Sequence, residues 1–147
     1  MNNENINNLN YILEGEYMAI NNFDDLIEHA TDINNNELQK IQQTHKHLAS
    51  QISTKIQKLG GNPSCSIGIQ GIVSATISNI KHIGTNDNAS FLKEALLSEH
   101  QGIKTVNEFL SDNDDPFTSE ILNTIITEYQ NNINSLNSLI ITSSNIH

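Results

Sequence analysis

Four ionisable residues lie on apolar lines from which charge is normally excluded. Each stands near the middle of a segment whose apolar residues recur every three or four positions, the spacing of one helix face: Glu16, His45, Glu99 and Glu128. Buried charges in proteins are paired, neutralised or bound to a metal. One such residue on each of four helices would place all four in one layer of a bundle, where helical bundles hold dinuclear metal sites.

Neighbouring polar residues extend this set to a candidate group of metal ligands. A carboxylate-bridged dimetal site takes one Glu from each of two helices and a Glu-x-x-His pair from each of the other two. The single positions are filled by Glu16 and Glu99, and the two pairs read Gln42-x-x-His45 and Glu128-x-x-Asn131. Both pairs are altered, because an amide replaces a carboxylate at position 42 and an imidazole at position 131. The predicted cofactor is a pair of iron or manganese ions, whose occupancy these changes put in question.

Four long amphipathic helices are predicted to position these residues. They span about 4–30, 36–59 and 90–110, and the fourth begins at Asp115-Pro116, an N-cap residue followed by proline at the first helical position. Gly60-Gly61 followed by Pro63 ends the second helix. A shorter amphipathic helix is expected at 69–83, and the polar tail, about 142–147, is expected to fray.

The lengths of the connections predict the topology. Short polar turns at 31–35 and 111–115 join the helices into two antiparallel hairpins, whereas 60–88 is long enough to cross the length of a helix. Two hairpins joined by one long crossover are the connection of ferritin-like bundles. We therefore expect residues 1–147 to form a single all-α domain, a four-helix bundle with a short extra helix in the crossover.

Three segments resemble the ferritin-like superfamily, and particularly its small rubrerythrin-related bacterial proteins of unknown function. They are Leu-Glu-Gly-Glu-Tyr-Met-Ala-Ile at 13–20, His45-Lys46-His47 leading to Lys-Leu-Gly-Gly-Asn-Pro at 58–63, and Ser-Glu-His-Gln-Gly-Ile at 98–103. In relatives that keep the metal, this resemblance implies metal storage or oxygen- or peroxide-linked redox chemistry. The chain has no Cys-x-x-Cys pair of a rubredoxin module, so any electron donor would be a separate protein.

A metal-free layer is the alternative. The three glutamates could share protons and hydrogen bonds with His45, Gln42 and Asn132. Whether His47, His100 or Asn132 substitutes for a missing ligand stays open, although His47 is expected to face outward and His100 to lie at the rim. The corresponding function is a non-catalytic interaction or structural bundle that works as a homo-oligomer, with the helix at 69–83 as its cap or dimer face. Whether the protein is an enzyme is not decided by the sequence.

Charge and composition exclude several classes of partner. The formal net charge is −10 with only seven Lys and Arg residues, which argues against binding to nucleic acid or to an anionic membrane surface. The first residues lack the pattern of a signal peptide, and no apolar run is long enough to span a bilayer. One cysteine allows no internal disulfide. These features predict a cytoplasmic protein.

Overall fold

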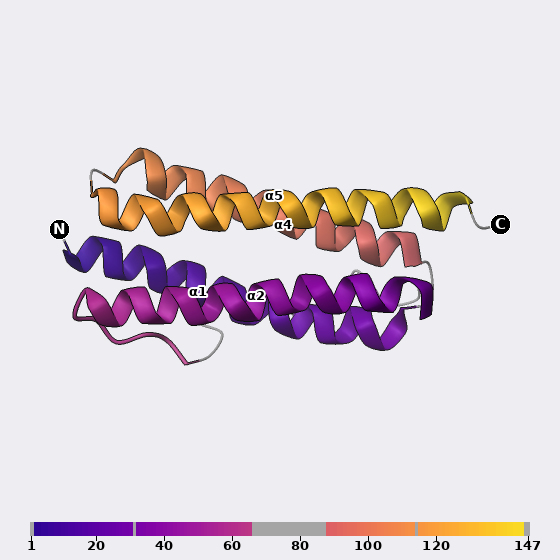
Figure 1. Cartoon of the computed structure of the whole chain (residues 1–147), viewed down its shortest axis with the longest axis horizontal. Helices are drawn as coiled ribbons and strands as arrows, with labels where there is room; N and C mark the ends of the chain where they lie inside the picture. Colours follow the sequence, from indigo (N-terminus) through magenta and orange to yellow (C-terminus); the bar gives the residue numbers. More distant parts are fainter. Residues whose placement is uncertain (1, 31, 66–87, 114, 146–147) are drawn as a thin grey trace.

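The computed structural model describes residues 2–30, 32–65, 88–113 and 115–145 (Figure 1). Within them lie four long helices: α1 (Asn2–His29), α2 (Asp32–Lys58), α4 (Asn88–Ser111) and α5 (Pro116–Asn145). The predicted all-α bundle is thereby confirmed, and each of the four long predicted helices is present within a few residues of its expected limits. The short helix predicted at 69–83 lies outside the described residues. Residues 142–145 of the expected tail differ from expectation, because α5 continues through Asn145.

The breaks between helices follow from residues that cap them. At the end of α2, Gly60 adopts φ 87°, a left-handed conformation that favours glycine. The Gly60 N–H donates to the Gln57 carbonyl at 3.0 Å and the Gly61 N–H to the Ile56 carbonyl at 2.9 Å, which is a Schellman ending. At the start of α5, the Asp115 carboxylate accepts hydrogen bonds from the backbone N–H groups of residues 117 and 118, as an N-cap residue does.

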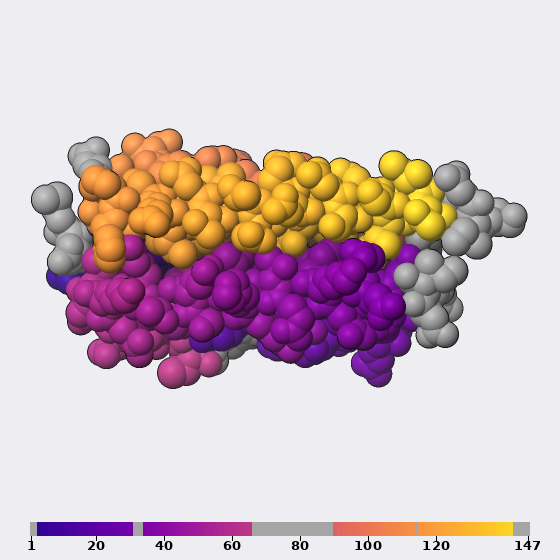
Figure 2. Space-filling model, in the orientation of Figure 1, coloured from indigo at the N-terminus to yellow at the C-terminus, as the bar shows by residue number. Residues whose placement is uncertain are grey.

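The four helices form two hairpins packed side by side. The closest packing is between α1 and α2 and between α4 and α5, and further contacts join α1 to α4 and α2 to α5. Figure 1 shows that α1 and α5 run in one direction and α2 and α4 in the other, so that each helix is antiparallel to both of its neighbours. Figure 2 shows α5 lying against α2 along most of the length of the bundle. The order around the bundle is therefore α1, α2, α5, α4.

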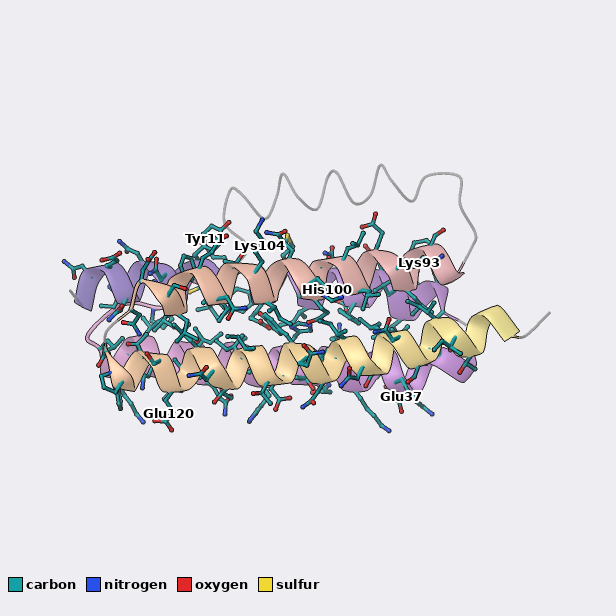
Figure 3. All side chains as sticks on the ribbon, turned by 90° about the horizontal axis from the view of Figure 1, so that it is seen from above. Tyr11, Glu37, Lys93, His100, Lys104 and Glu120 are labelled. Carbon is teal, nitrogen blue, oxygen red and sulfur yellow. The ribbon has the colours of Figure 1, made fainter. Side chains whose placement is uncertain are left out.

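The apolar core is divided into two clusters. One contains Leu13, Leu48 and Ile125 among its eleven buried members, and the other contains Phe23, Leu38 and Leu136 among its eight. On every helix the two clusters lie on opposite sides of a buried polar position. Figure 3 shows charged side chains such as Lys104 and Glu120 on the outside of the bundle. Among the described helices, none is long and apolar enough to cross a membrane.

Candidate functional site

His45 of α2 lies in the middle of the bundle between glutamates from two other helices. Its Nδ1 is 2.7 Å from Oε2 of Glu16 on α1, and its Nε2 is 2.6 Å from Oε1 of Glu99 on α4. The side chains of His45, Glu16 and Glu99 are buried, with 3%, 0% and 3% of their surface exposed. These are the short distances of charge-assisted hydrogen bonds. The imidazole is thus held at both of its nitrogens.

Two residues of α5 complete the layer. The Tyr129 hydroxyl donates a hydrogen bond to Oε1 of Glu16, and the Asn132 amide lies 3.4 Å from each carboxylate oxygen of Glu99. Both side chains are buried. Because Tyr129 and Asn132 are three positions apart, they lie on one face of α5. Hydrogen bonds therefore join α5 to α1, α1 to α2, α2 to α4, and α4 back to α5.

The geometry determines the charge of the layer. An ionised carboxylate accepts hydrogen bonds but has none to donate, so an imidazole with a proton on each nitrogen satisfies both contacts. Burial alone would lower the pKa of His45, but the negative charges of Glu16 and Glu99 and the hydrogen bonds to them raise it to about 10. Burial, reinforced by the charge of Glu16, raises the pKa of Tyr129 well above its ordinary value. Both shifts favour an imidazolium at His45 and a neutral phenol at Tyr129 at neutral pH.

The structure brings together three of the six residues proposed as metal ligands, namely Glu16, His45 and Glu99. Gln42 is also buried, but its amide points toward α1. Its Nε2 donates to the Ile20 carbonyl at 2.9 Å and to Oδ1 of Asp24 at 2.7 Å. The amide therefore connects α2 to α1 one turn away from the layer. This direction depends on partners about twenty positions earlier in the chain, which the spacing of α2 does not reveal.

On α5 the register differs from the expected one. Glu128 is half-buried and Asn131 is exposed, while the core positions are taken by Tyr129 and Asn132. Apart from Ile133, which is buried next to Asn132, the buried residues of this helix follow one another in alternating steps of four and three: Thr118, Leu122, Ile125, Tyr129, Asn132, Leu136 and Leu139. That alternation is the sequence signal for the correct face. His47 and His100 are both exposed, on the outside of α2 and α4.

This arrangement does not match the requirements of a dinuclear metal site. The two nitrogens of an imidazole point away from each other, so an ion on Nε2 of His45 would face Glu99 and an ion on Nδ1 would face Glu16. In the structure, each of those nitrogens instead lies within hydrogen-bond distance of a carboxylate oxygen, at 2.7 Å and 2.6 Å. Within the described ranges, no group of three or more His, Cys, Asp or Glu residues has an arrangement that could hold a metal ion.

Two antiparallel hairpins with a long connection between α2 and α4 define the class of ferritin-like bundles. A solved structure supports this assignment: a two-domain protein from Anabaena variabilis ATCC 29413, containing DJ-1/ThiJ/PfpI-like and ferritin-like domains, superposes with a TM-score of 0.78. The two sequences are 18% identical, and the match covers 100% of this chain but only 39% of that one. The ferritin-like fold is therefore confirmed.

The sequence family is also established. Residues 4–112 match the domain of unknown function DUF2383, and the chain belongs to this family. The matched region includes α1, α2 and all of α4, so it contains Glu16, His45 and Glu99. No curated protein is similar enough in sequence to count as a relative. A closer relation to rubrerythrin-related proteins stays a prediction.

Proposed function

We propose that this protein is a non-catalytic ferritin-like bundle whose core layer is stabilised by the proton of His45 in place of metal ions. The observation that carries the proposal is the pair of hydrogen bonds from one imidazole to Glu16 and Glu99. The imidazolium occupies the space between carboxylates of α1 and α4 and offsets part of their charge. Its role is then structural, since it holds four helices in one alignment, and the surface of the bundle is left for interaction.

A metal ion at His45 would have to displace a hydrogen bond between the imidazole and a glutamate. Binding at either nitrogen of His45 removes a shared proton and breaks a hydrogen bond to a buried carboxylate. Only one of the two carboxylates could follow the ion, because the ring separates them. The other would keep a hydrogen bond from the remaining ring N–H but would lose the positive charge of the imidazolium beside it. Hydrogen bonding therefore favours the protonated layer over a metal at these three residues.

Metal analysis tests the proposal directly. The protein would be produced in medium supplemented with iron and manganese, and its metal content and melting temperature measured with and without added Fe(II), Mn(II) or Zn(II). We expect trace metal and an unchanged melting temperature. A bound ion that is lost in Glu99→Gln but kept in Glu108→Gln would overturn the proposal, because Glu108 is an exposed glutamate of the same helix.

Metal binding by the layer is the second candidate function. It is favoured by the convergence of two carboxylates and one imidazole from three helices in a buried position. Iron or manganese held there would supply oxygen- or peroxide-linked redox chemistry, and Glu16, His45 and Glu99 would be the ligands. Electrons would have to come from a separate protein. Peroxide consumption that depends on added metal and is lost in Glu99→Gln would favour this candidate over the first.

Self-association is part of the structural proposal. The expected interface helix at 69–83 lies outside the described residues, so its contribution is best measured in solution. Light scattering would give the mass of the wild-type protein and of Ile72→Asp and Ile77→Asp. A mass of one chain for all three would exclude a homo-oligomer, whereas a larger mass that either substitution reduces would support it.

A further inference from the structure

Gly102 of α4 provides the space in which the Tyr129 ring lies. A Cβ atom at position 102 would stand 2.7 Å from Cε2 and 3.1 Å from Cδ2 of Tyr129. The first of these distances is shorter than carbon atoms tolerate, so a side chain at this position would force the ring to move. Gly102 also lies three positions after Glu99, which puts the two residues on one face of α4. The glycine thus admits the tyrosine immediately beside the polar layer.

Tyr129 stands at a position where a dimetal site would have a glutamate. Tyr129 and Asn132 have the i, i+3 spacing of a Glu-x-x-His pair and reach the same layer as Glu16, His45 and Glu99. A Glu and a His there would offer lone pairs to a metal, whereas the phenol and the amide N–H donate hydrogen bonds to the carboxylates. The Tyr129 ring also lies 5.7 Å from the His45 ring, centroid to centroid, in a tilted contact.

The count of charges leads to the same conclusion. Four carboxylates offset the four positive charges of two divalent ions in a complete dimetal site. The buried layer here retains two carboxylates, Glu16 and Glu99, and the imidazolium of His45 offsets one of them. Gln42 and Tyr129 stand where the other two carboxylates would be required. Two buried carboxylates are too few to offset two divalent ions, so the layer as it stands lacks the charge of a complete dimetal site.

We propose that Gly102 and Tyr129 form a matched pair that determines which cation the core layer holds. A carboxylate at position 129, together with Gln42→Glu and Asn132→His, converts the layer from holding a proton to holding divalent transition metal ions. The inference rests on the proposed function, because it takes the wild-type layer to be metal-free. The backbone positions of a dimetal site are retained, and the side chains of Gln42, Tyr129 and Asn132 decide its occupant.

The first experiment uses cobalt(II) as the probe, because its visible absorption reports coordination by protein ligands. The triple variant Gln42→Glu/Tyr129→Glu/Asn132→His is expected to bind about two cobalt ions per chain and to melt at a higher temperature when they are bound. Wild type is expected to show neither effect. If wild type binds cobalt through Glu99, the proposed function fails. If wild type binds none and the folded triple variant also binds none, the present inference fails and the proposed function stands.

The second experiment tests the matched pair without metal and does not depend on the triple variant. In wild type, Gly102→Ala is expected to lower the melting temperature by roughly 2–12 °C, because the added carbon meets the Tyr129 ring. With Tyr129→Val the ring is gone, and Gly102→Ala is expected to raise the melting temperature, since alanine is the better helix former. An equal loss in both backgrounds would refute the pairing of Gly102 with Tyr129.

Discussion

The protonated state of His45 predicts that the bundle loses stability as the solution becomes alkaline. The pKa of His45 is raised in the folded protein, so the folded state binds its proton more tightly than the unfolded chain does. The resulting stabilisation is complete below the unfolded pKa, near 6.5, and is lost as the pH rises through the folded pKa, at about 10. The relevant window is therefore between these two values.

The size of the effect follows from the difference between the two pKa values. A shift from 6.5 to about 10 spans about 3.5 pH units, and each unit corresponds to about 1.4 kcal/mol. The proton of His45 thus contributes on the order of 5 kcal/mol at pH 6. Small domains have total stabilities of about 5–15 kcal/mol, so the loss of this proton would remove a large part of the whole.

Urea unfolding followed by circular dichroism, repeated between pH 6 and pH 10, measures this loss. The control for the site is His45→Gln, which has no proton to release in this range and should show a nearly flat profile. The control for histidine titration in general is His47→Gln, because His47 is exposed on the same helix and should leave the wild-type profile unchanged. Other groups that titrate near pH 10 are present in all three proteins, so their effects cancel in the comparison.

One result would refute the reasoning. If the free energy of unfolding falls by the same amount for wild type and His45→Gln, the proton on His45 does not stabilise the folded state. The imidazole would then be neutral, with one carboxylate protonated in its place. Nitrogen chemical shifts of the ring would show this independently, because two protonated nitrogens are expected up to about pH 9.

Three further substitutions test individual contacts. Tyr129→Phe removes one hydrogen bond to a buried carboxylate and should cost about 1–3 kcal/mol in urea unfolding. Gln42→Glu places a negative charge beside a carbonyl and a carboxylate of α1 and should lower the melting temperature, whereas Gln43→Glu on the exposed side of α2 should not. Asn10→Ala removes two of the hydrogen bonds that attach residues 62 and 64 to α1 and leaves those of Tyr17 and Glu14 to Ser64. Hydrogen exchange at 61–65 should therefore accelerate, with exposed Asn7→Ala as the unchanged control.

The fold could be predicted because its determinants are local. Gly60 ends α2 through its own left-handed conformation, and Asp115 begins α5 through its own carboxylate. The register of α1, α2 and α4 was also predictable, since Glu16, His45 and Glu99 each interrupt a line of apolar residues. Such signals depend on residues within one or two turns, and the sequence displays them directly.

The details of the site were harder to predict because they depend on partners distant in sequence. On α5, Glu128 and Tyr129 are adjacent, and the apolar line through Ile125 and Leu136 predicts Glu128 as the buried residue. The structure buries Tyr129, whose hydroxyl reaches Glu16 and whose ring requires Gly102. The role of Gly102 follows only from the position of a ring on the neighbouring helix. Spacing gives the face of a helix, but the chemistry of the layer depends on how three or four helices meet.

The division of the core into two apolar clusters has a consequence for how the bundle opens. The apolar side chains of each cluster pack against one another, and the polar layer separates the two clusters. The end that contains Phe23 and Leu136 has eight buried apolar members against eleven at the other end, so less apolar surface holds it closed. That end is expected to open as a separate cooperative unit, and its amides to exchange before those around Leu13 and Ile125. The ion pairs of His45 then mark the point at which partial opening stops, because going further separates buried charges.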